Sequence, residues 1–273
     1  MTKDGLIWLS FGALVTAAGP WLWGWGRVRS TSLTHAWFWL LLGGVAVACL
    51  TPFAHAGGPL RPLRYVALVV LATFPLAVLG AVRPRLSAWS FVLVGWLAAA
   101  SLPLLQVSWR SPAWYLDGAW LAFLGGVWIV GVVNYLPTRF GLPVSLVGCA
   151  LGWNVWQMRL GAETDPVLEI MLLQLALAGG AWWAWWLARR HEETRESDVD
   201  RLWFRVRNLF GVTWASRIQQ QTQAAAHHAG LEGRLTWFGL SGLDGQEATQ
   251  AATTRREWHR LLAAASARFV DSV

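Results

Sequence analysis

Charged residues are scarce in this chain and absent from long parts of it. Asp, Glu, Lys and Arg together make up 14% of the 273 residues. Seven stretches of at least eighteen residues contain none of the four: 5–26, 30–60, 65–82, 86–109, 118–138, 140–158 and 170–188. A helix needs about 20 predominantly apolar residues to cross the hydrocarbon core of a bilayer. We therefore predict seven transmembrane helices.

The scarcity of charge also limits what these spans can do. A proton- or sodium-driven pump usually carries a carboxylate within a span, and the seven stretches have none. Asp117 and Glu169 fall at span ends, where we expect them to reach water. Retinal binding requires a lysine in a late span, but Lys3 is the only lysine in the chain. Ion-coupled pumping and retinal photochemistry are therefore disfavoured.

Cysteine is rare as well, and common binding motifs are missing. Cys49 and Cys149 both fall in apolar stretches, so we expect two apolar side chains rather than a disulfide or a zinc site. The sequence contains no phosphate-binding loop, dinucleotide fingerprint or nucleic-acid-binding motif. Most of the net charge of +7 lies in short loops between the spans, which is typical of a membrane protein.

The predicted fold class is an all-α polytopic membrane protein, a seven-transmembrane-helix bundle with a small C-terminal α/β (helix–strand–helix) cytoplasmic tail. A transmembrane domain covers residues 1–188, a charged linker 189–200 and a soluble tail domain 201–273. Within the first domain we predict spans at about 5–26, 35–55, 65–82, 87–108, 118–137, 141–158 and 169–188. The first span could be a signal peptide, but its apolar residues continue past Ala18 to Trp25, which suits a spanning helix.

Arginines in the loops predict the orientation. With seven spans the termini lie on opposite sides of the membrane. A cytoplasmic tail places eight arginines inside: Arg27, Arg29, Arg83, Arg85, Arg139, Arg189, Arg190 and Arg195. The basic residues outside are then Lys3, Arg61, Arg64, Arg110 and Arg159. The positive-inside rule favours this arrangement, so we predict an integral protein of the cell (inner) membrane with its N-terminus outside and its tail in the cytoplasm.

Polar and small residues interrupt the apolar spans. Asn134, Asn154 and Gln157 are expected to form hydrogen bonds between helices. They could instead line one polar cavity, although they fall near opposite ends of adjacent spans. Close helix packing is expected at Gly43-Gly44, Gly125-Gly126, Gly148 with Gly152, and Gly179-Gly180. Kinks or interruptions are expected at Pro20, Pro75 and Pro103. Most of the 22 tryptophans fall near span ends, as in an aromatic belt.

The tail begins with a predicted amphipathic helix. One apolar stripe recurs at three- and four-residue spacing, formed by Trp203, Val206, Phe210, Trp214 and Ile218. Gly211 lies inside this pattern and makes an unbroken helix less favourable. Because the helix closely follows the last span, we expect its first half to contact the membrane surface or a partner. The residues assigned to this contact are Trp203, Phe204, Arg205, Arg207 and Trp237.

The rest of the tail predicts one strand and one helix. Arg234–Leu240 has the composition of a strand, and glycines after it mark turns. A second helix is expected from Thr254, with Glu257 completing a capping box. One strand cannot form a sheet alone, so either a second strand is hidden or this strand pairs with another chain.

Three functions are compatible with these patterns. The leading interpretation is a non-enzymatic subunit or accessory (assembly) protein whose tail docks a protein partner or a second copy of the chain. The alternative is a permease for an uncharged or apolar solute. The least favoured is a haem- or quinone-handling protein that uses His35 or His55, which bracket the second span. We expect contact with the lipid bilayer, and no catalytic residue, cofactor, metal or nucleic acid.

Overall fold

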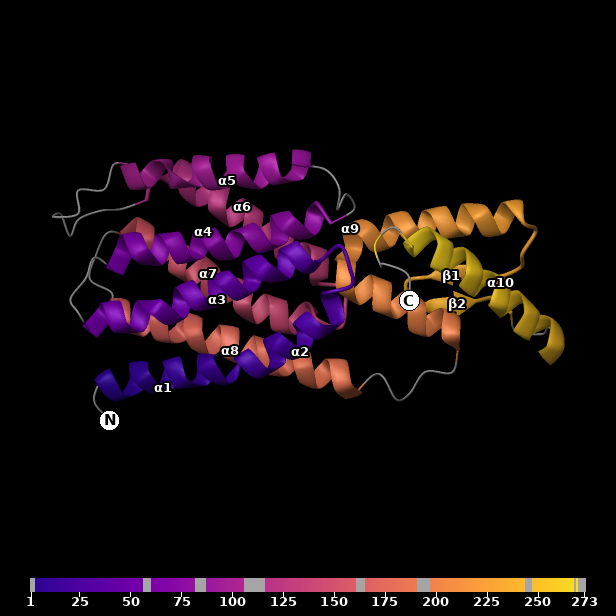
Figure 1. The fold of residues 1–273 in the computed structure, drawn as a ribbon, viewed down its shortest axis with the longest axis horizontal. Coiled ribbons are helices and arrows are strands. Elements are labelled where there is room, and N and C mark those ends of the chain that lie inside the picture. The colour runs from indigo at the N-terminus through magenta and orange to yellow at the C-terminus, as the bar shows by residue number, and fades with distance from the viewer. Residues whose placement is uncertain are drawn as a thin grey trace.

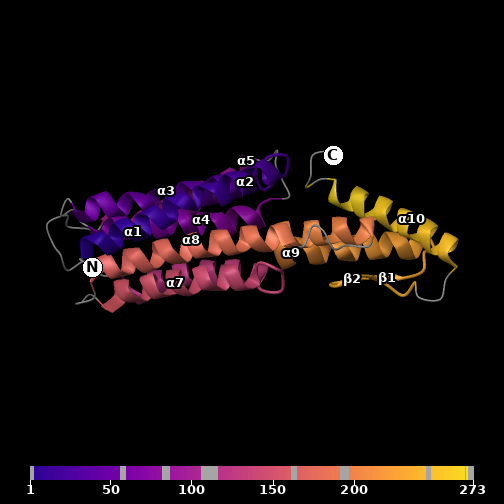
Figure 2. The same cartoon turned by 90° about the horizontal axis from the view of Figure 1, so that it is seen from below.

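The computed structural model describes residues 3–55, 60–81, 87–105, 116–160, 165–190, 197–243, 247–267 and 269. These residues form a long helical bundle with a smaller tail at one end (Figure 1). The bundle helices are α1 (Lys3–Thr16), α2 (Ala18–Val28), α3 (Thr34–His55), α4 (Leu60–Leu79), α5 (Ser87–Leu105), α6 (Gly118–Tyr135), α7 (Gly141–Leu160) and α8 (Pro166–Arg190). In the perpendicular view the tail extends the bundle along its long axis (Figure 2).

Helices occupy all seven predicted spans, and within the described residues five are long and apolar enough to cross a membrane. Those five are Asp4–Val28, Thr34–Ala54, Leu60–Leu79, Gly118–Tyr135 and Val167–Arg190. The apolar part of α5, Trp89–Leu105, is shorter, and α7 is more polar because it carries Asn154, Gln157 and Arg159. The apolar helices support a helical membrane protein.

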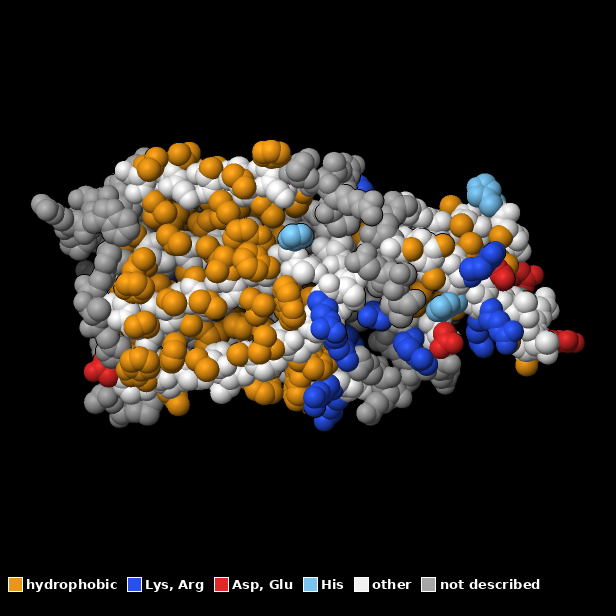
Figure 3. Space-filling view, viewed as in Figure 1, with side chains coloured by type: hydrophobic (Ala, Val, Ile, Leu, Met, Phe, Trp, Pro, Cys, Tyr) orange, Lys and Arg blue, Asp and Glu red, His pale blue; other side chains and the backbone are white. Residues whose placement is uncertain are grey.

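Large apolar side chains cover the face of the bundle that Figure 3 shows. Leu9, Phe91, Ile129 and Leu142 are 62%, 73%, 64% and 66% exposed. A soluble protein rarely exposes a continuous apolar surface, whereas hydrocarbon chains match it. Cys49 and Cys149 also lie on the outside as free thiols.

The first predicted span consists of two helices. α1 ends at Thr16 and α2 begins at Ala18, so the chain is interrupted at Ala17. Pro20 lies in the first turn of α2, where its missing N–H removes no helical hydrogen bond. In contrast, α4 and α5 continue through Pro75 and Pro103. Among these three prolines, Pro20 is thus the one that lies at the start of a helix.

Six helices form a closed ring, in which α2, α3, α4, α6, α7 and α8 each contact the next and α8 contacts α2. Five of these contacts contain a glycine whose added Cβ would lie within 2.8 Å of the neighbouring side chain: Gly24 against Trp37, Gly43 against Leu71, Gly131 against Pro75, Gly148 against Val132 and Gly180 against Val147. Close approach of the helices therefore requires these glycines. Among the other glycines expected to pack closely, Gly125, Gly126 and Gly152 have open space around them.

The expectation that Glu169 reaches water is wrong. Its side chain is 3% exposed and forms an ion pair with Arg64, which is equally buried, between α8 and α4. Asn154 Nδ2 also donates to the Glu169 carbonyl at 3.4 Å. Removing a charge from water costs several kcal/mol, and a close opposite charge offsets much of that cost. Each of these two charges is therefore held inside the bundle by the other.

A second buried polar group joins three helices. Gln174 in α8 accepts a hydrogen bond from Ser10 Oγ of α1 at 2.8 Å. Its Nε2 donates to the Val47 carbonyl and to Thr51 Oγ1 of α3, at 3.2 and 2.9 Å. These are the interhelical hydrogen bonds that polar residues in spans are expected to form. Asn134 lies near the other end of the bundle, so Asn154 and Gln157 do not share a cavity with it.

The tail begins with α9 (Asp198–His228), a bent helix that starts at the N-cap Ser197. Gly211 has non-helical backbone angles, and two arms meet there against the end of the bundle (Figure 1). The predicted apolar stripe is largely buried, since Trp203, Val206, Phe210 and Ile218 are at most 1% exposed. The stripe packs within the tail and against the bundle.

The segment Arg234–Leu240 is a hairpin, not the single strand expected. β1 (Arg234–Thr236) pairs antiparallel with β2 (Gly239–Ser241), with Leu235 opposite Leu240. The hidden second strand therefore lies inside the predicted one. At the turn between the two strands, the Thr236 hydroxyl accepts a hydrogen bond from the Phe238 N–H at 3.2 Å. The sequence pattern did not reveal this local turn.

The last helix, α10 (Ala248–Ser266), also differs from expectation. It begins at Ala248 rather than at Thr254, and its N-cap Glu247 makes no side-chain capping bond. Glu257 does not cap the helix, because it lies within it and pairs with Arg260 at 2.9 Å. The expected apolar face is present: Trp258 and Leu262 are fully buried, and α10 packs against α9.

Candidate functional site

The bend of α9 is bound by one side chain of the bundle. Gly211 has a φ of +70°, a conformation that favours glycine, and the helical hydrogen-bond ladder is interrupted there. Asn134, in the last turn of α6, supplies substitute partners. Its Nδ2 donates to the Phe210 carbonyl at 3.4 Å, and its Oδ1 accepts from the Thr213 N–H at 3.0 Å. A Cβ on Gly211 would lie 2.2 Å from Asn134 Nδ2, so the site requires glycine.

Four further hydrogen bonds attach the tail to the same end of the bundle. Each joins a tail residue to α4, to α6 or to the loop after α6: Trp214 Nε1 to the Val78 carbonyl at 3.1 Å, Tyr135 Oη to the Leu209 carbonyl at 2.9 Å, Trp237 Nε1 to the Pro137 carbonyl at 2.9 Å, and the Arg139 N–H to Asn208 Oδ1 at 3.5 Å. The tail is therefore seated on the bundle through several independent contacts.

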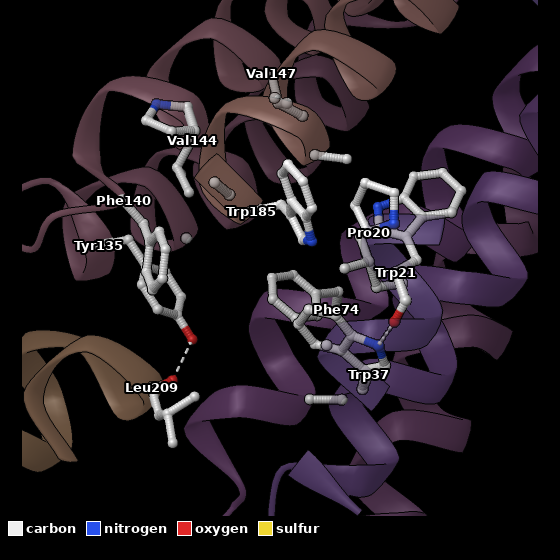
Figure 4. Close-up of a pocket in the computed structure, with 18 of the residues that line it drawn as sticks. Pro20, Trp21, Trp37, Phe74, Tyr135, Phe140, Val144, Val147, Trp185 and Leu209 are labelled. Atoms are coloured by element: carbon white, nitrogen blue, oxygen red, sulfur yellow. Dashed lines mark hydrogen bonds between the residues drawn. The ribbon is translucent and has the colours of Figure 1, made fainter. Parts of the chain in front are cut away.

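A cavity of about 240 Å³ lies inside the ring, next to the bend of α9. All six ring helices line it, and Asn208 and Leu209 of α9 line its tail end. In Figure 4 the rings of Trp37, Phe74, Tyr135 and Trp185 surround the open centre, with Leu209 close to Tyr135. The tail thus closes one end of a cavity that lies within the bundle.

The chemistry of the cavity is apolar and aromatic. Two of its aromatic residues turn their polar atoms to backbone partners, since Tyr135 Oη donates to the Leu209 carbonyl and Trp37 Nε1 donates to the Trp21 carbonyl at 3.0 Å. The buried Nε1 of Trp128, another lining residue, has no hydrogen-bond partner among the described residues. Among the described lining residues, the ionisable ones are Arg27, Tyr135 and Arg139. The volume is slightly below the range of about 300–1,000 Å³ typical of ligand pockets. It suits a slender apolar group such as one segment of a hydrocarbon chain.

Four of the five residues assigned to partner or membrane contact lie together. Arg207 Nη1 and Trp203 Nε1 both donate to the Trp237 carbonyl, at 2.7 and 3.3 Å, and the Arg207 guanidinium lies 4.5 Å from the Phe204 ring centroid. Trp203 and Arg207 are buried, Phe204 and Trp237 are half-buried, and Arg205 is exposed apart from them. Within the chain these contacts hold the hairpin against α9. A contact with a partner or lipid stays a prediction.

The most exposed aromatic of the tail was not selected from the sequence. Phe238, at the turn of the hairpin, is 86% exposed. Its neighbour Trp237 is hydrogen-bonded to Pro137, so Phe238 lies close to the end of the bundle. A single phenylalanine in so short a segment gives no periodic signal, which is why pattern reading missed it.

The histidines do not converge on a cofactor site. His35 is exposed on α3 and does not line the cavity, and the side chain of His55 lies outside the described residues. In the part of the chain that the structure describes, no group of three or more His, Cys, Asp or Glu side chains could hold a metal ion. The haem or quinone interpretation gains no support from this geometry.

Replacing Asn134 with alanine should loosen the tail. Asn134→Ala leaves the buried Phe210 carbonyl without its partner, at about 1–3 kcal/mol, and also removes the part-buried bond to the Thr213 N–H. We expect faster hydrogen–deuterium exchange in peptides that cover residues 208–215. Ser101→Ala is the control, because Ser101 bonds only within its own helix, to the Leu97 carbonyl. Unchanged exchange at Thr213 in Asn134→Ala would contradict the assigned role.

Comparisons with known proteins do not place the chain in a family. No protein-family model, no curated protein and no solved structure matches it. The function must therefore be inferred from the geometry of the cavity and its cap.

Proposed function

We propose that the protein is a membrane-embedded binding protein or carrier whose capped cavity holds the apolar part of a lipid-soluble molecule. The observation that carries this proposal is an aromatic cavity of about 240 Å³ inside the ring. An empty cavity costs on the order of 24 cal/mol per Å³ in lost packing, or about 6 kcal/mol for this volume. A hydrocarbon segment that fills the space recovers those contacts.

Binding suits this site better than catalysis. The described lining residues include no Asp, Glu, His, Cys or Lys that could act as an acid, a base or a nucleophile. A carrier of this kind is one form of the permease for an apolar solute, the alternative function predicted from the sequence. The bend of α9 closes one end of the site, since Asn208 and Leu209 line the cavity there.

The membrane topology that accompanies this proposal has seven spans, with α1 and α2 forming the first. The N-terminus is outside and the tail is in the cytoplasm of a cell. This orientation is supported by Arg27, Arg139, Arg189 and Arg190, which belong to the end of the bundle that bears the tail, where Figure 3 shows a group of basic side chains. The other basic residues used for the prediction include Arg83, Arg85, Arg110 and Arg195, which lie outside the described residues.

A reporter fusion tests the topology. A fluorescent protein that folds only in the cytoplasm, fused after Val273, should be fluorescent, and alkaline phosphatase at the same position should be inactive. The same two reporters fused before Met1 should give the opposite result. Active phosphatase after Val273 would refute the orientation.

Filling the cavity should block binding. Ala184→Phe places a ring in the cavity, whereas Ala98→Phe places the same ring on the exposed side of α5. The probes are phosphatidic acid and diacylglycerol analogues with a diazirine at the end of one acyl chain, tested separately in nanodiscs. At least one should cross-link to residues 144–147, and Ala184→Phe should reduce that labelling by about tenfold because packing worth about 1.4 kcal/mol is lost.

Labelling at Phe91, which is exposed outside the ring, provides an internal reference. It should be the same in wild type, Ala184→Phe and Ala98→Phe. Cross-linking by neither probe within the ring, or equal labelling of residues 144–147 in all three proteins, would contradict the proposed function.

A second candidate is a non-enzymatic accessory subunit whose tail docks a partner, or a second copy of the chain. The exposed aromatic Phe238, beside the half-buried Trp237, favours it, because exposed aromatic side chains are enriched in binding surfaces. The sequence predicted this contact on the first half of α9 and at Trp237, which lies in the turn of the hairpin. The hairpin turn is the more accessible surface.

Replacing Phe238 with serine tests this second candidate. Affinity purification from native membranes in mild detergent should recover a stoichiometric partner, or a dimer, with the wild-type protein. Phe238→Ser should weaken the affinity for that partner or second copy by about tenfold or more, as expected for an aromatic that contributes at least 1.4 kcal/mol to an interface. Thr253→Ser, an exposed change on α10, is the control. A wild-type protein purified as a partner-free monomer would refute the candidate.

A further inference from the structure

Positive charge gathers at the tail end of the cavity. Arg27, at the end of α2, and Arg139, in the loop after α6, both line it. Arg189, near the end of α8, stacks on Trp185, another lining residue. Among the described lining residues none is acidic. Basic side chains also cover the surface where the bundle meets the tail (Figure 3). The cavity is therefore apolar inside and cationic at one end.

Three arginines lie on aromatic rings of the cavity wall. The guanidinium carbons are 3.9 Å from the Trp23 centroid for Arg27, 4.8 Å from Phe140 for Arg139, and 4.1 Å from Trp185 for Arg189. A guanidinium stacked by its face keeps its N–H groups at its edge, where they can bind phosphate oxygens in pairs. Arg27 and Arg139 have further interactions within the chain, and each has five N–H donors to share.

We propose that the ligand of the cavity is an amphiphile with a phosphate headgroup. This inference depends on the proposed function, because the same cavity holds the apolar chain. The headgroup lies between Arg27 and Arg139 at the tail end, and the chain extends into the ring. This division of charged and apolar surface matches a lipid whose phosphate lies at the level of the cytoplasmic headgroups. A neutral lipid lacks the group that these arginines recognise.

The test compares two lipids with the same photoreactive acyl chain in nanodiscs, phosphatidic acid and diacylglycerol. Labelling of residues 144–147 should reach half of its maximum at a lipid fraction about tenfold lower for phosphatidic acid than for diacylglycerol. Arg27→Gln and Arg139→Gln should each remove most of that difference and leave diacylglycerol labelling unchanged. Arg27→Lys and Arg139→Lys keep the charge, so they should retain part of the difference and exclude misfolding as its cause.

Arg159→Gln is the matched control. Arg159 also stacks on a tryptophan, Trp156, but belongs to the opposite end of the bundle and does not line the cavity. Arg159→Gln should not change the labelling by either lipid. Inorganic phosphate should bind at least about tenfold more weakly than phosphatidic acid, because it has no chain to occupy the cavity.

The outcomes separate the inference from the function on which it depends. Equal labelling by the two lipids, unaffected by Arg27→Gln and Arg139→Gln, would overturn the headgroup assignment and leave the proposed function in place. An equal loss in Arg159→Gln would indicate general surface attraction and would also overturn it. Binding of inorganic phosphate as tightly as phosphatidic acid would indicate an anion site without a lipid and would also overturn the headgroup assignment. No labelling by either lipid would refute the proposed function itself.

Discussion

The relation between the bundle and the tail depends on the amide of Asn134. A helix that bends at a glycine leaves backbone groups unpaired, and such groups are costly when buried. Asn134 binds one carbonyl and one N–H on the two sides of Gly211, so the bend is stable only where α6 ends. Leu209 thereby reaches the ring and closes the cavity. This pair of hydrogen bonds holds the bend, and four further hydrogen bonds and a shared apolar cluster seat the tail on the bundle.

Much of the helical architecture could be predicted because the bilayer imposes a simple rule. Backbone groups in hydrocarbon must bond internally, so long charge-free runs become helices. In the tail, the spacing of Trp203, Phe210 and Ile218 correctly indicated a buried helix face, and Gly211 marked its interruption. Periodicity shows which face is buried but not what covers it. It therefore suggested membrane or partner contact, where the structure has contacts within the chain.

Features that depend on pairs of distant residues could not be predicted. Nothing local to Arg64 or Glu169 indicates that α4 and α8 bring them together away from water. The hairpin was missed because its turn contains Trp237 and Phe238 rather than the Asn-Gly or Gly-Gly pairs typical of tight hairpin turns. The cavity is a void between apolar surfaces of six helices. Its lining residues look like any other apolar residues, so only their arrangement in space reveals it.

An electron cryo-microscopy structure in nanodiscs that contain phosphatidic acid tests the central claim most directly. We predict that the bend of α9 is seated on Asn134. We also predict elongated density inside the ring, between Trp37 and Trp185, that ends near Arg27 and Arg139. A ring collapsed on itself, with the rings of Trp37 and Trp185 in contact and no space between them, would contradict it. So would a tail detached from α6 beside an empty cavity.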